Sequence, residues 1–403
     1  MQLSRRGLVG AGALLPGLAS ASVAASPERA RFPFEGVYLD AAFTHPLGTF
    51  VAEAADKLTR ARLAAPQAVG PRGNPRRGAV ERFARLINAA PTDIAVVPST
   101  LAGENMLAAA LGIGPGAGVV TDALHYDASL ALYGELGKRG APVAVARPRE
   151  DGRVDLADLR DLITPQTRLV AVSLVSSATG FEHDLAELCA VAHARGALVY
   201  ADIIQAAGAI PVDVRASGVD FACCGTYKWL MGDFGAAFLY VHPDRLDRLK
   251  RVEVGWRQIR RQDSHVFPFE PPGPALGAYE LAHDAAGLFE VSTPAWGALA
   301  AASAGMDYVL ARGVQDISHT RQPLTDAVFE GLAGLGFRPL TAKGARSPIV
   351  AFAAPNLGLA YSEALRTAGI TVSLYRHRVR VSASVYNTTA DVERFINVFA
   401  SAR

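Results

Sequence analysis

Net charge and cysteine are both scarce in this 403-residue chain. Its 40 lysines and arginines against 38 acids leave a formal charge of +2, and no basic run is interleaved with aromatic residues, so nucleic acid is not an expected partner. Cys189, Cys223 and Cys224 form an odd set, and the adjacent pair lies in an apolar stretch, which favours core positions over a disulfide. Half of the residues are hydrophobic, which predicts a globular chain with room for two domains.

Acidic residues are absent before Glu28, and this absence sets the first 25 residues or so apart. Arg5-Arg6 precedes an apolar, Gly/Ala-rich stretch, and the small residues at 23–25 offer a cleavage site. The segment resembles a twin-arginine signal and predicts export to the periplasm. Pro16 interrupts a weakly hydrophobic run, so no stable membrane span is expected after cleavage, although an uncleaved segment could act as an anchor.

Two apolar runs near the middle of the chain end in polar groups. Residues 197–201 read as a buried strand that ends in Asp202, and residues 219–224 read as a second strand that leads to Lys228. Ligands bind at the carboxyl ends of strands in open α/β sheets. A lysine and an aspartate placed there suit pyridoxal phosphate (PLP), because the lysine forms the Schiff base and the carboxylate keeps the pyridine nitrogen protonated. Either residue alone would more often be a cap or a solvated charge.

A turn upstream has the composition of an anion site. A short strand at 94–97 leads to Pro98-Ser99-Thr100-Leu101, and a helical run follows from Glu104. Unpaired backbone N–H groups and the helix dipole favour a phosphate at such a helix start. An ordinary N-cap by Ser99 or Thr100 is the alternative interpretation.

The ordered set of motifs resembles the class V aminotransferase superfamily of fold-type-I PLP enzymes. That superfamily includes cysteine desulfurases, kynureninases and isopenicillin N epimerase-like proteins. The resemblance covers roughly everything after the signal segment. It is carried by Asp202-x-x-Gln205, Pro211-Val212-Asp213, Gly218-Val219-Asp220-Phe221, Lys228-Trp229-Leu230 with Gly232, and upstream by Val172-Ser173, Thr179-Gly180, Asp184-Leu185 and Ala192-His193.

The resemblance implies an α/β fold with a large PLP-binding domain and a smaller α+β carboxyl-terminal domain. The large domain would hold a mixed, mostly parallel sheet flanked by helices. The expected divisions are a signal segment at 1–25, a segment packing near the active site at 26–45, the large domain at 46–290 and the small domain at 291–403.

The resemblance also assigns the site residues. Lys228 and Asp202 take the roles given above, and His125 stacks on the PLP ring, with Tyr126 as the alternative occupant. Arg380 binds the substrate α-carboxylate, although Arg376 and Arg378 compete on spacing. Ser177 lies where the family commonly has an asparagine near the cofactor or substrate. The remaining cofactor contacts are Ser99, Thr100 and Leu101 at the phosphate, Gln205 at the phenolic oxygen, Thr226 and Tyr227 before the lysine, and Thr293, which reaches the neighbouring subunit's phosphate and so implies a homodimer.

Where the sequence departs from the family pattern, it reduces the number of reactions expected of this chain. Residues 362–380 contain no cysteine, whereas a desulfurase needs a nucleophilic one before the carboxylate-binding arginine. Aminotransferase, epimerase and β-lyase (C–S lyase) chemistry remain, with Lys228 moving the Cα proton. We favour aminotransferase-type chemistry on an amino-acid-like small molecule or peptide that is exported, and a non-catalytic PLP-fold binding protein is the second alternative. No metal site is expected. Residues 252–275 read as an irregular active-site or dimer loop.

Overall fold

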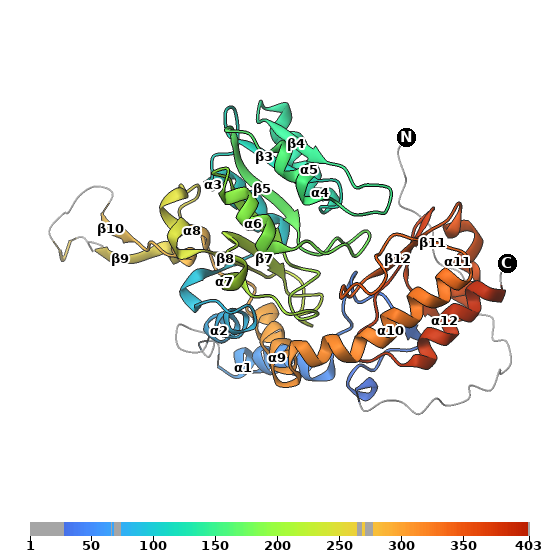
Figure 1. Ribbon diagram of the computed structural model, residues 1–403. Helices are drawn as coiled ribbons and strands as arrows, with labels where there is room; N and C mark the ends of the chain where they lie inside the picture. The colour runs from blue at the N-terminus through green and yellow to red at the C-terminus, as the bar shows by residue number, and fades with distance from the viewer. Residues whose placement is uncertain (1–27, 66, 68–73, 264–267, 271–276, 402–403) are drawn as a thin grey trace, which may run out of the picture.

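A seven-stranded sheet forms the centre of the larger of two lobes (Figure 1). The computed structural model describes residues 28–65, 67, 74–263, 268–270 and 277–401, so the expected signal segment lies outside it. The strand order is β2-β8-β7-β6-β5-β3-β4. β8 is antiparallel to both of its neighbours and the other adjacent pairs are parallel, which confirms the expected mixed, mostly parallel sheet. The strands are β2 (Ile94–Val97), β3 (Gly118–Asp122), β4 (Val143–Ala146), β5 (Thr167–Ser173), β6 (Leu198–Asp202), β7 (Phe221–Gly225) and β8 (Ala237–Val241).

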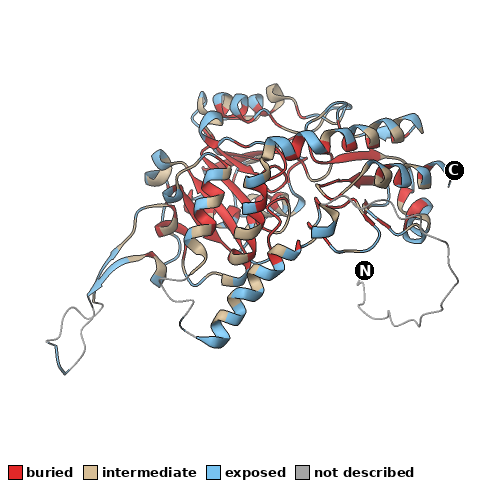
Figure 2. Ribbon diagram, turned by 90° about the horizontal axis from the view of Figure 1, so that it is seen from below, coloured by how far each residue is buried: buried red, intermediate tan, exposed pale blue. Residues whose placement is uncertain are grey.

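Both faces of this sheet are buried under helices, which is why its strands are almost continuously apolar. Successive residues of β6 belong to opposite cores, with Val199 and Ala201 on one face and Leu198 and Tyr200 on the other. Figure 2 shows the buried strands enclosed by helices with exposed outer surfaces. One face packs against α2 (Arg76–Leu86), α5 (Leu156–Leu162), α6 (Leu185–His193) and α9 (Trp296–Arg312), and the other against α3 (Thr100–Ala110), α4 (Asp127–Lys138) and α8 (Ala285–Phe289).

The smaller lobe is a four-stranded antiparallel sheet of order β11-β12-β15-β14 with helices against it. The amino-terminal β1 (Val37–Tyr38) crosses to this lobe and pairs in parallel with β13 (Ile370–Thr371). The other elements here are β11 (Arg338–Pro339), β12 (Val350–Ala353), β14 (Ser373–Leu374), β15 (Arg378–Val381), α10 (Val314–Gly334), α11 (Leu357–Thr367) and α12 (Thr389–Ser401). The expected boundary at residue 290 precedes α9, which packs on α1 (Thr49–Ala64) and α2 in the larger lobe, whereas α10 reaches the smaller one.

The stretch expected to be irregular at 252–275 is partly a strand. β9 (Ile259–Asp263) pairs with β10 (Ala278–Leu281) in an antiparallel ribbon that extends away from the larger lobe (Figure 1). The sequence did not predict this ribbon, because its residues are mostly exposed and do not alternate between apolar and polar. The remaining short elements are α7 (Val214–Ser217) and 3-10 turns at Arg29–Arg31, Pro91–Asp93, Pro243–Arg248 and Trp256–Gln258.

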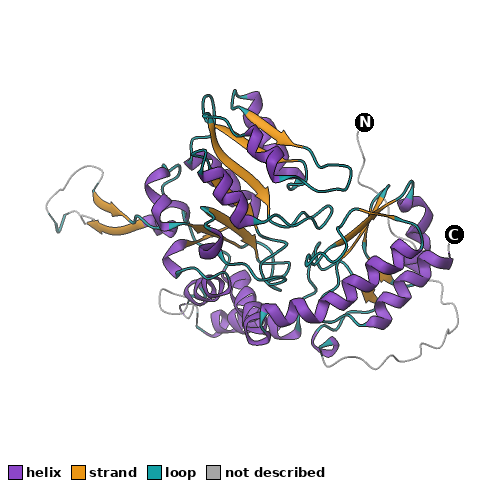
Figure 3. Cartoon of the chain, in the orientation of Figure 1, coloured by secondary structure: helices purple, strands orange, loops and turns teal. Residues whose placement is uncertain are grey.

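The loops that follow the sheet strands face the smaller lobe, as Figure 3 shows. Asp202 ends β6 directly beside Cys223 of β7, so the segment after β7 leaves the sheet next to this aspartate. No helix in the described ranges is both long enough and apolar enough to cross a membrane.

Candidate active site

Lys228 lies in the connection between β7 and β8, where most of its surface is covered by protein. Burial lowers the pKa of its amine to about 8, because the charged form loses its hydration, and the negative charge of Asp202 opposes this effect only in part. A lysine with a lowered pKa is a better nucleophile and base near neutral pH. The structure therefore places at this position the kind of amine that the sequence predicts.

Asp202 is buried at the end of β6, with 4% of its surface exposed. Burial raises the pKa of this carboxyl to about 6, while a hydrogen bond from the backbone N–H of Ile204, at 2.9 Å from Oδ1, and the charges of His125 and Lys228 act in the opposite direction. The carboxylate is thus ionised at neutral pH. A cationic ring nitrogen beside it would stabilise the ionised form further.

His125 follows β3 and is fully enclosed by polar partners. Its Nδ1 lies 2.8 Å from Oγ of Ser173, and its Nε2 lies 3.0 Å from Oε1 of Glu104. Burial alone lowers the pKa of an imidazole, but the charge of Glu104 and its hydrogen bond to His125 outweigh that effect and raise the pKa. Tyr126, the alternative occupant, has 44% of its surface exposed. Sequence reasoning missed Glu104, because an acid in a helical run usually faces solvent.

The turn before α3, here called the phosphate cradle, is where the sequence predicts an anion site. The helix begins at Thr100, four residues earlier than the sequence indicated, because Oγ of Ser99 caps it by accepting from the N–H of Ala102 at 3.1 Å. Within the described chain, no hydrogen-bond acceptor is found for the N–H groups of Thr100 and Leu101. Gly103 lets the helix approach the sheet closely, since a Cβ at this position would lie 2.8 Å from Sγ of Cys223. Two free donors at a helix start fit a phosphate.

Two threonine hydroxyl groups near this cradle form hydrogen bonds that join neighbouring segments of the chain. Oγ1 of Thr100 accepts from the N–H of Gly225 at 2.9 Å, and so joins α3 to the end of β7. Thr226 is fully buried, and its hydroxyl donates to the carbonyls of Asp233 and Ala236. Its backbone N–H also donates to Ala236, so Thr226 has no spare donor, and its contact with the cofactor stays a prediction.

The side chains on either side of Lys228 are also fixed. Tyr227 stacks on Phe234 with ring centroids 4.8 Å apart. Nε2 of Gln205 donates to the carbonyl of Ala42 at 2.9 Å, and Oε1 of Gln205 accepts from Nε1 of Trp229 at 2.9 Å. Gln205 keeps a second N–H for another acceptor. Its expected bond to the phenolic oxygen, and the role of Tyr227, stay predictions.

Arg380 projects from β15 into a buried polar cluster. Its Nη2 donates to Oδ1 of Asp40 at 3.0 Å and to Oγ of Ser373 at 2.7 Å, and its Nη1 donates to the carbonyl of Ser177 at 3.0 Å. Nε of Arg380 is buried and has no partner in the described chain. Burial raises the pKa of the Asp40 carboxyl, against the charge of Arg380.

Asp40 is a second residue of this polar cluster that sequence reasoning missed. It lies 340 positions from Arg380, and β1 brings it there by pairing with β13. The carbonyl of Ser177 accepts from Arg380, and the expected contact of Ser177 with cofactor or substrate stays a prediction. Thr293 is exposed, beside a cavity of about 340 Å³ that Pro98 also lines, and its contact with a partner subunit stays a prediction.

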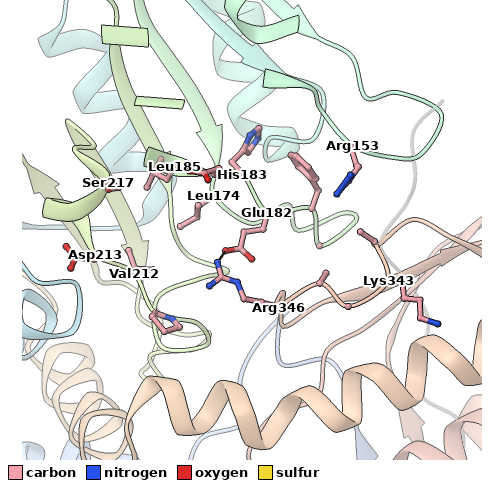
Figure 4. A pocket seen from close by; sticks show the side chains of 17 residues that line it. Arg153, Leu174, Glu182, His183, Leu185, Val212, Asp213, Ser217, Lys343 and Arg346 are labelled. Atoms are coloured by element: carbon pink, nitrogen blue, oxygen red, sulfur yellow. Dashed lines mark hydrogen bonds and ion pairs between the residues drawn. The ribbon is translucent and has the colours of Figure 1, made fainter. Parts of the chain in front are cut away.

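A cavity of about 510 Å³ lies elsewhere in the molecule. It lies between the two lobes and contains none of Lys228, Asp202 or Arg380. In Figure 4, Glu182 and Arg346 face each other across it as an ion pair of 2.5 Å. His183, also on its wall, pairs with Asp122 at 3.0 Å. Glu182 and Arg346 thus pair within the lining, whereas His183 and Lys343 pair with Asp122 and Glu330, which lie outside it.

The residues around Lys228 fit PLP chemically. A buried amine can bond to the cofactor aldehyde, and a buried carboxylate can serve the ring nitrogen. The free N–H groups at the start of α3 suit the phosphate. The sequence predicted an amine, a carboxylate and backbone N–H donors for a PLP site, and all three lie at one end of the sheet.

Comparison with known proteins agrees with this geometry. The family model "Aminotransferase class-V" matches residues 37–395. A probable cysteine desulfurase of Methanothermobacter thermautotrophicus is 31% identical, over 50% of this chain and 51% of its own. A cysteine desulfurase of Klebsiella pneumoniae is 28% identical over 78% and 79%. An uncharacterized aminotransferase of Bacillus subtilis, YcbU, is 27% identical over 79% and 81%.

Solved structures show the same fold. The cysteine desulfurase CsdA of Escherichia coli superimposes with a TM-score of 0.78 at 23% identity, covering 93% of this chain and 97% of its own. The cystine C–S lyase C-DES, in complex with its product cysteine persulfide, gives a TM-score of 0.80 at 20% identity, covering 92% and 99%. The likeness confirms the expected fold-type-I architecture.

Proposed function

The chain belongs to the aminotransferase class-V family, and from this premise we propose that it is a PLP-dependent enzyme acting at the Cα of an amino-acid substrate. The observation that carries the proposal is the pair formed by buried Asp202, at the end of β6, and the largely covered Lys228, just beyond the end of the adjacent β7. A structural lysine would have little reason to be buried beside the end of a sheet with its pKa lowered.

The chain's own residues divide the work. PLP, when bound to Lys228, supplies an electron sink for the bonds at Cα. The backbone N–H groups of Thr100 and Leu101 would hold the phosphate, and Asp202 would stabilise the charge at the ring nitrogen. Lys228 would accept and return the Cα proton of the substrate, for which a pKa of about 8 is well placed near neutral pH.

Arg380 is the proposed anchor for the substrate α-carboxylate. Its guanidinium is already held on three sides by Asp40, Ser373 and Ser177, so its direction is fixed before a ligand arrives. A preorganised guanidinium loses little side-chain entropy on binding a carboxylate. The negative charge of Asp40 reduces the favourable free energy of substrate binding, because the incoming carboxylate must share the Arg380 cation with it.

We propose aminotransferase-type chemistry on an exported small molecule or peptide, with β-elimination or epimerisation as the alternatives. Several relatives are named cysteine desulfurases, but this chain has no cysteine at 362–380. Cys189, Cys223 and Cys224 are buried, and burial raises the pKa of each thiol, so none is a ready nucleophile. Persulfide formation on an enzyme thiol is therefore not proposed.

A homodimer and export complete the proposal. Thr293 is exposed, and the β9–β10 ribbon extends away from its own lobe with mostly exposed residues, so both are free to meet a second subunit. Export is supported by the Arg5-Arg6 segment alone. Periplasmic fractionation of a tagged full-length chain, and its loss with Arg5 and Arg6 changed to lysine, would test it.

One experiment separates the reactions. Purified holoprotein is mixed with single amino acids, including cystine and D-enantiomers, without any keto-acid acceptor. Transamination gives one equivalent of keto acid and converts the bound cofactor to its amine form. Continuous release of ammonia and a keto acid would instead support β-elimination, and inversion of the substrate would support an epimerase. No change with any amino acid or peptide would favour the binding-protein alternative.

A further inference from the structure

Glu104 occupies an unusual place for an acid. It lies in the second turn of α3, immediately behind the phosphate cradle, with 1% of its surface exposed. Its carboxyl accepts from the hydroxyl of Tyr133 at 2.6 Å, from the hydroxyl of Ser129 at 2.5 Å and from Nε2 of His125 at 3.0 Å. Ser129 and Tyr133 lie on one face of α4, so the two helices and the end of β3 enclose this carboxyl completely.

This hydrogen-bond set suits a carboxylate that only accepts, because each of the three neighbours can donate to it. A neutral carboxyl would have to direct its own proton at one of three groups that can each donate to it. A buried carboxylate in turn is stabilised by a counter-charge, because desolvation of an unpaired ion is unfavourable. Among the described residues, the ion-pair partner of Glu104 is His125.

The surroundings of His125 favour a positive charge on its ring. The titratable groups that face it are Glu104 from α3, Tyr133 from α4, Asp122 at the end of β3 and Asp202 at the end of β6. None of these groups is cationic, and the ring's other nitrogen meets the hydroxyl of Ser173, which can accept a hydrogen bond.

A second buried histidine shows what the carboxylate contributes. His45 is equally enclosed, but its ring nitrogens meet the carbonyl of Pro46 and the hydroxyl of Ser384, with no acid among them. Burial then dominates and lowers the pKa of His45 to about 4, whereas the pKa of His125 is raised. The two rings differ in their charge partner rather than in their depth.

We propose that Glu104 is a positioning residue of the reaction, which holds His125 as a fixed imidazolium against the cofactor ring instead of a neutral stacking ring. This inference rests on the proposed function for the place of the cofactor. A cation fixed at that face would lower the energy of electrons that move from the substrate toward the ring. It would also help to keep Asp202 ionised, since opposite charges stabilise one another in a dry site.

The test is the protonation state of His125 in the full chain, followed by NMR of protein labelled with ¹⁵N in its nine histidines. The variant His125→Asn identifies the signal. In the wild type, both with and without PLP, both ring nitrogens of His125 should carry protons at pH 7. In Glu104→Gln, which keeps the shape and can still accept, the titration midpoint should fall by about one pH unit or more.

Tyr133→Phe is the matched control, because it removes one donor to the same carboxyl but leaves the charge. Its midpoint should stay within a few tenths of the wild-type value. A neutral His125 in the wild type at pH 7 overturns the proposal, and so does a Glu104→Gln variant that titrates like the wild type. The wild-type measurement decides even where Glu104→Gln does not fold.

Kinetics add a second readout. Glu104→Gln should lower kcat with little change in KM, and Glu104→Asp should recover part of the loss, since it restores the charge at a shorter reach. Equal kcat values for wild type and Glu104→Gln would contradict the role. The NMR signal of PLP-free protein does not depend on turnover, so a chain that never binds PLP defeats the proposed function while the state of the Glu104–His125 pair is still read directly.

Discussion

The site has two halves that face each other, and each half contains a buried acid near a cation. In the sheet half, Asp202 and Lys228 influence one another's charge, yet no ion pair within 4.0 Å joins these two described residues. In the lobe half, Asp40 and Arg380 form a closed pair at 3.0 Å. The open pair leaves both groups available to a cofactor, whereas the closed pair offers a cation that is already partly neutralised. The first half is thus suited to hold a cofactor, and the second to orient a substrate.

Breaking the sheet half at Lys228 should have the largest effect. Lys228→Ala removes the amine that bonds to the cofactor, so the visible absorbance of lysine-bound PLP should vanish and turnover should fall by more than about 10⁴-fold. Lys250→Ala, at an exposed lysine, is the control and should behave as wild type. A Lys228→Ala variant with the wild-type spectrum would show that another residue holds the cofactor.

Neutralising Asp202 should separate cofactor binding from catalysis. Asp202→Asn keeps the acceptor for Ile204 but removes the counter-charge at the ring nitrogen, so PLP should still bind while kcat falls by about 10²-fold or more. Asp213→Asn, at an exposed helix cap, is the matched control. A wild-type kcat in Asp202→Asn would refute the assigned role.

Removing the guanidinium of Arg380 should weaken substrate binding and leave cofactor binding unchanged. Arg380→Ala should weaken substrate binding by about 2–4 kcal/mol, with an unchanged visible spectrum, and Arg380→Lys should recover only part of this. Because Arg380→Ala leaves Asp40 buried and unpaired, the double variant with Asp40→Asn tests binding without that charge. Arg376→Ala, at an exposed arginine, controls for net charge.

Normal processing of the true substrate by both Arg380 variants would remove the carboxylate-binding role. The better interpretation would then be a substrate whose reacting residue has no free carboxylate, such as an internal residue of a peptide.

The smallest expected effect is the dependence of the rate of PLP capture on pH. Burial lowers the pKa of Lys228 to about 8, so the neutral amine that attacks the cofactor aldehyde becomes abundant as the pH rises through that value. The rate at which PLP-free protein captures PLP, followed by stopped-flow absorbance, should rise up to about pH 8 and then level off. A rate that keeps rising beyond pH 10 would indicate an exposed, unperturbed lysine.

The sheet half could be predicted from the sequence because its members end strands that lie next to each other in the sheet. Asp202 and Lys228 each follow a short apolar run, and parallel strands deliver their carboxyl ends to one edge. The lobe half could be predicted only in part. Arg380 was found by resemblance, but the pairing of β1 with β13 that brings Asp40 to it joins segments more than 300 residues apart, and no local pattern reports such a pairing.

The burial of Glu104 could not be predicted from the sequence for a different reason. Its burial depends on three donors from two other segments, which meet it only after α3 and α4 have packed on the sheet. The strand at Ile259–Asp263 was missed because an exposed ribbon has no apolar alternation. Composition and spacing report local structure and burial, whereas these features depend on contacts between distant segments.

Chemical trapping can show whether Lys228 carries PLP. Holoprotein purified with its cofactor is reduced with borohydride, which makes the lysine–cofactor bond permanent, and the digested peptides are read by mass spectrometry. We expect a single modified peptide with the cofactor mass on Lys228. Modification of a different lysine, or no modified peptide from a protein that has bound PLP, would contradict it.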